Sequence, residues 1–298
     1  MIVTYRSKDF TRLLQTIKLF WDPSKCDQQI KMELISIRRF TSRLQKLLLW
    51  SNVLCIVLVM SFPLLQNKFP TGIWTMEGYA VLYRCVMIGQ TIIVPLSALS
   101  LCALDCMYLG LCTEIVIQFR MLSHYLQKLK SEDSIIDEME INQLNQIKSL
   151  VRLFFRFVKE FRRAFSLVLL IEFVVDGPLI CAELLAGFES TLQVFMIKDD
   201  HNIRNCKFVC FSPSYQAQAR HVIVFIFVNL QLAFFCISAN YITNEALAVS
   251  DAVYFSNWYS QHIPSLKVPL LLIIQNSQNE IAIKGGGLVT INAGTIVN

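Results

Sequence analysis

Charge is scarce in this chain of 298 residues, and the scarcity excludes most classes of soluble protein. Charged residues make up 16% of the sequence and hydrophobic residues 54%, whereas a soluble domain averages about 25% charged residues. The few charges also separate long apolar stretches from one another. The composition therefore predicts an all-α integral membrane protein, a helical bundle in a lipid bilayer.

Sequence motifs for catalysis, metal binding and nucleotide binding are absent. There is no His-Glu-x-x-His and no Gly-x-Ser-x-Gly, and the run Gly285-Gly286-Gly287 lacks the Gly-Lys-Ser/Thr of a phosphate-binding loop. The cysteines show no paired Cys-x-x-Cys with histidines at zinc spacing. The basic residues lack the pattern of a nucleic-acid module. We therefore expect no enzyme, no metal site, no cofactor and no nucleic-acid partner.

The basic residues are concentrated in two stretches, and this predicts the orientation in the membrane. Residues 1–46 hold ten Lys and Arg and residues 118–163 hold nine, out of twenty-seven in the chain. Loops that collect positive charge next to membrane spans lie on the cytoplasmic side. We therefore predict a cytoplasmic N-terminus, with residues 1–46 as a cytoplasmic segment.

A transmembrane bundle is predicted over residues 47–244, with Leu47–Gln66 as the first span and His221–Asn244 as the fourth. Between them, Gly78–Gln118 is too long for one crossing, since it would measure roughly 60 Å as a helix and the hydrocarbon core measures about 30 Å. A hairpin of two spans is the alternative, but it would move the second basic stretch outside. We therefore predict one long helix over residues 78–130 that leaves the membrane at its end.

The third predicted span, Ala164–Phe188, follows a predicted cytoplasmic helix over residues 147–163 and carries three carboxylates. Glu172, Asp176 and Glu183 lie four and then seven residues apart, which places them on one face of a helix. Carboxylates in a membrane face the bundle interior or water. Either they line a polar cavity or cation route, or they form a structural strip that bonds neighbouring helices.

Three further regions complete the predicted organisation. Residues 189–220 are predicted as an outer loop, in which Cys206 and Cys210 form a disulfide or remain free thiols. Residues 245–284 are predicted as a cytoplasmic anchor region. Residues 285–298 are predicted as the truncated start of a final span. The chain should therefore hold four complete transmembrane helices and the beginning of another.

Four motifs together resemble the insect odorant receptor family. The most telling is Asn244-Glu245-Ala246-Leu247-x-x-Ser250-Asp251-Ala252-Val253-Tyr254-x-x-x-Trp258-Tyr259, followed by Leu270-Leu271-Leu272-Ile273-Ile274. The others are Phe69-Pro70-x-x-x-Trp74 before Tyr79, Gln118-Phe119-x-x-Leu122, and the Phe-rich stretch from Phe154 to Phe165. The resemblance implies seven spans in the intact family, of which this chain would hold the third to the sixth. On that basis we expect a chain incomplete at both ends.

The resemblance also implies a function. It implies an odorant receptor subunit in the plasma membrane of olfactory sensory neurons, which binds small volatile odorants in the outer half of the bundle. It further implies a cation channel gated as a hetero-tetramer with a co-receptor subunit. By position, the ligand-binding candidates are Val59, Met60, Phe62, Tyr83, Met87, Gln90, Ile223, Phe227 and Leu230; lipid contact or bundle packing is the alternative role of each. Tyr254, Trp258 and Tyr259 are candidate subunit anchors.

Two other functions stay open at this point. A gustatory receptor would share the same plan and differ in its final span. A transporter or scaffold would use the strip of Glu172, Asp176 and Glu183 to move cations, although the sequence shows no inverted repeat of the kind many transporters have.

Overall fold

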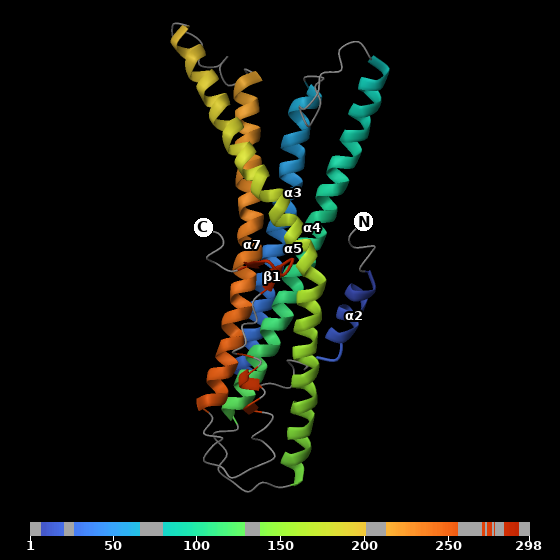
Figure 1. Ribbon diagram of the computed structural model, residues 1–298, viewed down its shortest axis with the longest axis vertical. Helices are drawn as coiled ribbons and strands as arrows, with labels where there is room; N and C mark the ends of the chain where they lie inside the picture. The colour runs from blue at the N-terminus through green and yellow to red at the C-terminus, as the bar shows by residue number, and fades with distance from the viewer. Residues whose placement is uncertain are drawn as a thin grey trace. The chain divides into compact units, whose positions relative to one another are not determined.

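Long α-helices make up nearly all of the computed structural model (Figure 1). The helices are α2 (Ser7–Ile17), α3 (Gln28–Leu65), α4 (Ala80–Lys128), α5 (Glu138–Asp200) and α7 (Pro213–Phe255), followed by the strands β1 (Ile283–Gly285) and β2 (Val289–Ile291). The structure describes residues 7–20, 27–65, 80–128, 138–200, 213–255, 270, 271, 273–275, 277 and 283–291.

The segment that is too long for one crossing forms a single helix. α4 runs from Ala80 to Lys128 without the break that a hairpin of two spans would need. Pro95 lies inside it and cannot donate a backbone hydrogen bond to the carbonyl of Thr91. Helices in membranes tolerate such a proline because neighbouring groups satisfy the freed carbonyl or the backbone adjusts locally.

Helices extend into both ends of the predicted outer loop over residues 189–220, and its position outside the membrane stays a prediction. α5 continues to Asp200 and α7 already begins at Pro213. Proline is favoured in the first turn of a helix, where its missing N–H would have no partner in any case. The stretch Thr191–Ile197 is rich in residues that are compatible with a helix, and polarity alone does not end one. Cys206 and Cys210 lie outside the described residues.

Three helices in the described part of the chain are long and apolar enough to cross a membrane. They cover Val81–Gln127, Val151–Glu189 and His221–Phe255, which include three of the four predicted spans. The remaining predicted span, Leu47–Gln66, forms the second half of α3, and the structure does not describe the side chains at its end. The count of four spans stays a prediction.

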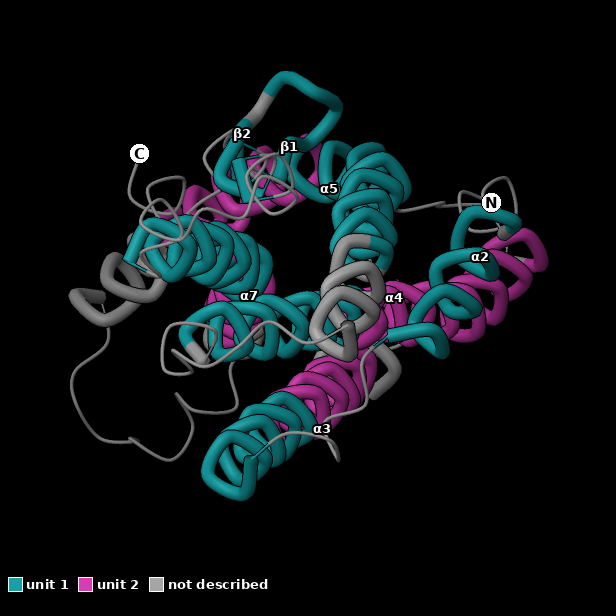
Figure 2. Tube along the Cα trace, turned by 90° about the horizontal axis from the view of Figure 1, so that it is seen from below, with its two compact units in different colours: residues 1–42, 108–173, 233–298 teal, residues 43–107, 174–232 magenta. Residues whose placement is uncertain are grey.

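The chain divides into two compact units, shown in two colours in Figure 2. Unit 1 comprises residues 1–42, 108–173 and 233–298. Its core is aromatic: the ring of Tyr108 packs against Phe161, Phe165 and Phe235 at centroid distances of 5.7, 5.2 and 5.1 Å. Tyr108 and Phe161 are completely buried. The Phe-rich stretch thus supplies the centre of unit 1.

Unit 2 comprises residues 43–107 and 174–232, and several polar groups are buried in it. Large apolar side chains are exposed on its helices, among them Ile93 on α4 and Leu185 on α5. Asn52, Asp105, Asp176 and Gln231 are buried instead, one on each of its four helices. An apolar outward face with polar groups turned inward is the pattern of helices that contact lipid.

A small β-hairpin in unit 1 replaces the predicted start of a final span. β1 and β2 pair antiparallel with Gly285 opposite Val289, and Gly286 and Gly287 form the turn with φ of 61° and 77°. Only glycine adopts such angles without strain. The backbone N–H of Gly286 donates to the carbonyl of Ser166 on α5 at 2.8 Å. The glycine run therefore makes a tight turn against α5 rather than opening a helix over the described residues 285–291.

Candidate functional site

The predicted ligand-binding residues on α4 lie on one face within unit 2. Tyr83, Met87 and Gln90 are half-buried, whereas their neighbours Ile88 and Ile93 are exposed. Spacings of four and three residues keep the three predicted side chains on the same side of a helix. α4 therefore presents a mixed aromatic, thioether and amide surface on its inward face.

The predicted residues on α3 and α7 divide into inward, outward and undescribed ones. Met60 on α3 is buried, and Ile223 and Phe227 on α7 are half-buried. Leu230 is exposed on the outward side of α7, as is Ile226. Lipid contact, the alternative role considered for each candidate, fits Leu230 best. The side chains of Val59 and Phe62 lie outside the described residues.

A hydrogen bond between two buried side chains joins α4 and α7 inside unit 2. The amide Nε2 of Gln231 donates to Oδ2 of Asp105 at 2.9 Å, and both side chains are buried. Close by in the sequence, Nε2 of Gln45 on α3 donates to the backbone carbonyl of Cys106 at 2.7 Å. These two bonds fix the register of α3, α4 and α7 in unit 2.

The three aligned carboxylates on α5 all face inward, but they have different surroundings. Glu172, in unit 1, is buried and takes part in a polar interaction. Glu183, in unit 2, pairs with Nδ1 of His221 on α7. Asp176, also in unit 2, is buried, and its Oδ2 has no hydrogen-bond partner among the described residues. The strip therefore does not act as three equivalent acids.

A charged cluster ties α3, α4 and α7 together inside unit 1. The guanidinium of Arg120 on α4 donates to Oε1 of Glu245 at 2.8 Å and to the hydroxyl of Tyr241 at 2.7 Å, both on α7. It also pairs with Glu33 on α3. The planar guanidinium offers five donors in a fixed fork, which suits such a junction of several acceptors. We call Arg120, Glu33, Tyr241 and Glu245 the Arg120 cluster.

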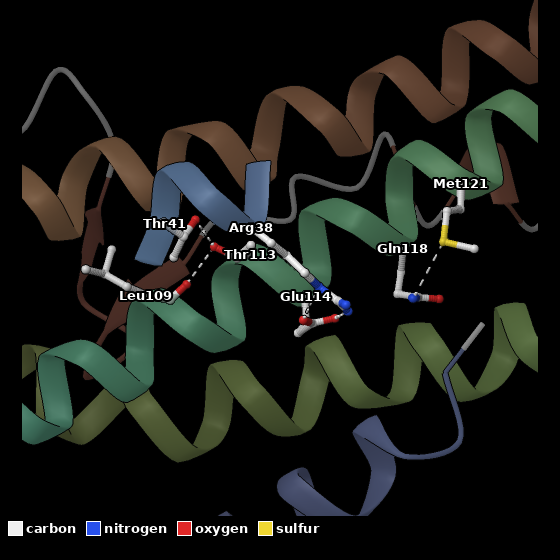
Figure 3. Close-up of polar contacts among 7 residues, drawn as sticks. All are labelled: Arg38, Thr41, Leu109, Thr113, Glu114, Gln118 and Met121. Carbon is white, nitrogen blue, oxygen red and sulfur yellow. Dashed lines mark hydrogen bonds and ion pairs between the residues drawn. The ribbon is translucent and has the colours of Figure 1, made fainter. Parts of the chain in front are cut away.

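Polar contacts also line the boundary between α3 and α4 in unit 1 (Figure 3). Arg38 forms a two-pronged ion pair with Glu114, with N···O distances of 3.1 and 3.0 Å. The hydroxyls of Thr41 and Thr113 lie 2.7 Å apart. Because the residue numbers rise along α3 while they fall along α4, these contacts show that the two helices run antiparallel.

The predicted subunit anchors can be compared with the structure at one position. Tyr254 lies at the end of α7, highly exposed, with its ring edge-on to the exposed ring of Phe255 at 5.4 Å. Trp258 and Tyr259 lie outside the described residues. An exposed aromatic pair at a helix end provides the apolar area that subunit interfaces use.

Sequence reasoning missed the Arg120 cluster and the pair of Asp105 with Gln231. In the sequence, Arg120 is one of nine basic residues that indicate topology, and Glu245 is part of a family motif. Asp105 and Gln231 are 126 residues apart, so no local spacing links them. The available signal was their rarity, because a lone acid in a long apolar helix needs a partner inside the bundle.

Long helices with exposed apolar side chains and a few buried polar groups define a helical membrane protein, as the sequence predicted. The family comparison gives the class more exactly. Residues 1–196 and 206–298 match the family described as 7tm Odorant receptor, and the chain belongs to that family. The predicted resemblance is thereby confirmed.

Solved structures show the same fold. The insect olfactory receptor OR5 from Machilis hrabei aligns with a TM-score of 0.75 and 14% sequence identity, covering 99% of this chain and 72% of that one. The same receptor in complex with eugenol aligns with a TM-score of 0.71 and 15% identity, covering 98% and 71%. A comparison with the curated proteins finds no match.

Proposed function

We propose that this chain is the odorant-binding subunit of a ligand-gated cation channel that works with a co-receptor subunit. The observation that carries the proposal is the match to the odorant receptor family over nearly the whole chain. The likeness in fold to a receptor that was solved in complex with eugenol, a small aromatic molecule, supports it. The plasma membrane of olfactory sensory neurons is the corresponding location.

The proposed ligand site is the inward surface of unit 2. Met87, Tyr83 and Phe227 are half-buried and offer polarizable and aromatic contacts, and Met60 on α3 is buried. A small apolar ligand gains roughly 25 cal/mol per Å² of apolar surface removed from water. A site that is mostly apolar with a few polar groups is the usual design for such ligands.

Enlarging Met87 tests the location of this site. In receptors co-expressed with a co-receptor, we expect Met87→Trp to raise the half-maximal odorant concentration about tenfold or more for the bulkier active ligands. The added ring must displace ligand or neighbours, at a cost of about 1–3 kcal/mol. Dose–response curves of whole-cell current measure the change.

Ile88 supplies the matched control for this experiment, because it is the next residue on α4 and is 59% exposed. Ile88→Trp adds similar bulk on the outward face, so odorant potency should change less than about twofold. If Met87→Trp changes the response to none of the odorants tested, while surface expression is normal, the ligand does not contact α4 at this position.

The orientation of the chain is a separate part of the proposal. We propose that the N-terminus and the start of α5 are cytoplasmic, because the basic residues gather there. An epitope inserted at position 140 should be stained only after the cells are permeabilised. Staining of intact cells would reverse the orientation and, with it, the assignment of the outer half.

A further inference from the structure

Two acceptor oxygens inside unit 2 lack a hydrogen-bond donor among the described residues: Oδ2 of Asp176 and Oδ1 of Asn52. Asp176 is 6% exposed and Asn52 is 5% exposed. Leaving a buried acceptor unpaired costs about 1–3 kcal/mol, and more for a charged group. Two such groups in one compact unit call for a specific explanation.

Helix register places the two acceptors within about one helical turn of each other in depth. Asp176 precedes Glu183 by seven residues, so it lies two turns below the contact of Glu183 with His221, at the level of Val228 on α7. Asn52 follows Gln45 by seven residues, two turns above the contact with Cys106, at the level of Leu99 on α4.

The hydrogen bond between Asp105 and Gln231 relates these two levels, because it shows which positions of α4 and α7 lie at the same depth. Val228 lies three residues before Gln231, and Leu99 lies six residues before Asp105. At about 1.5 Å per residue, Asp176 and Asn52 therefore lie roughly one turn apart in depth, just above the Asp105 bond. Both are buried on the inward faces of their helices.

Nearby donors on α7 are already engaged. Nε2 of Gln231 donates to Asp105, Nδ2 of Asn229 donates to the carbonyl of Phe225 at 2.8 Å, and His221 is paired with Glu183. Moving Gln231 would take this donor from buried Asp105, and moving His221 would break its pair with Glu183. With these donors engaged, a donor group on a bound ligand would satisfy the two acceptors.

We propose that Asp176 and Asn52 form a polar subsite that accepts hydrogen bonds from an O–H or N–H group of the ligand. The ligand class is a small apolar molecule with a donor head group, an alcohol or an amine. The inference rests on the proposed function, since it specifies what the odorant site selects. Ethers and other molecules that only accept hydrogen bonds offer no donor to this subsite. Their oxygen would add a third acceptor to those of Asp176 and Asn52.

Three probes with equal numbers of heavy atoms test the subsite: 1-octanol, octylamine and methyl heptyl ether. The full chain, purified in phosphatidylcholine nanodiscs, is titrated with each probe, and binding is followed by the rise in melting temperature with ligand concentration. At least one donor probe should bind about tenfold more tightly than the ether, because one buried hydrogen bond is worth about that factor.

Substitutions locate the discrimination. Asp176→Leu and Asn52→Leu should each bring the donor probes and the ether to within about threefold of one another. Asn229→Leu is the matched control: the side chain of Asn229 bonds to its own helix, so the preference for donors should survive. Asp176→Asn keeps a carbonyl acceptor but removes the carboxylate. This substitution should weaken the binding of octylamine, because the ammonium group loses the carboxylate. It should leave the binding of 1-octanol unchanged, because the amide oxygen can still accept its hydrogen bond.

The outcomes separate this inference from the proposed function. If all three probes bind equally well, or if the preference for donors survives both leucine variants, the subsite does not exist while the odorant site stands. If the folded chain binds none of the probes, the subsite fails, and the proposal of a ligand site in unit 2 loses its support as well.

Discussion

Replacing Arg120 by methionine is expected to lower the free energy of unfolding by about 2–3 kcal/mol. The substitution removes the cation that joins Glu245 on α7 to Glu33 on α3. The side chain of Glu245 is 13% exposed, so its charge would be poorly hydrated. The estimate lies below the value for a fully buried pair because Arg120 and Glu33 reach solvent. Unfolding in detergent micelles, followed by far-UV circular dichroism, measures the loss.

Arg156 provides the control for this prediction. It also pairs with a glutamate, Glu160 on the same helix, but its side chain is 72% exposed. Exposed pairs of this kind contribute about 0.3–0.5 kcal/mol, so Arg156→Met should have almost no effect. Arg120→Lys should fall between the two, because lysine keeps the charge and loses the fork. Equal effects of Arg120→Met and Arg156→Met would show that the Arg120 cluster adds no stability.

Truncating Phe161 to alanine is expected to cost about 3–5 kcal/mol, the largest effect predicted for a single residue of this chain. Its ring is fully buried and packs against Tyr108 and against Phe165, with centroids 5.7 and 4.9 Å apart. The change removes these ring contacts and leaves a cavity in unit 1. The same unfolding measurement applies, and the yield of folded protein should fall with it.

Phe40 provides the control for this prediction, since it is a phenylalanine of unit 1 that is largely exposed on α3. Phe40→Ala should cost less than about 1 kcal/mol. A small effect of Phe161→Ala would mean that the aromatic cluster does not form the core of unit 1. A large effect of Phe40→Ala would point to a buried contact of α3 with a lipid or another subunit.

The helical membrane class could be predicted from the sequence, because an inference from composition and from the length of apolar stretches needs few assumptions. Scarce charge, long apolar stretches and clustered Lys and Arg are properties of the whole chain, and they do not depend on which residues touch. The single long helix α4 could be predicted for the same reason. The family resemblance followed from motif order and is confirmed by the family match.

The contacts of the candidate site could not be predicted in this way. Arg120 meets Glu33 across 87 residues and Glu245 across 125, and nothing local in the sequence marks these distances. Leu230 lies between two polar residues, Asn229 and Gln231, but residues 222–228 and 232–237 on either side of them are all apolar and give no preference for one face. Where both faces are apolar, hydrophobic periodicity carries no information about direction.

Helix ends were misjudged for a related reason. Residues 189–200 look like loop because they are more polar than the preceding span, yet they contain nothing that breaks a helix. The glycine run is predicted as part of the start of a final span, although glycine favours turns over helices. In both cases local conformational preference would have been a better guide than polarity.

The turn of the β-hairpin packs directly against the backbone of α5. A Cβ at Gly285 would lie 3.3 Å from the backbone nitrogen of Leu170, and one at Gly286 would lie 2.5 Å from its Cδ2. Because the Gly286 N–H also donates to the carbonyl of Ser166, we expect a rotation or sliding of this turn of α5 to move β1 and β2 with it. Leu288, 83% exposed at the hairpin tip, is then a natural place for a spectroscopic label that reports such displacements.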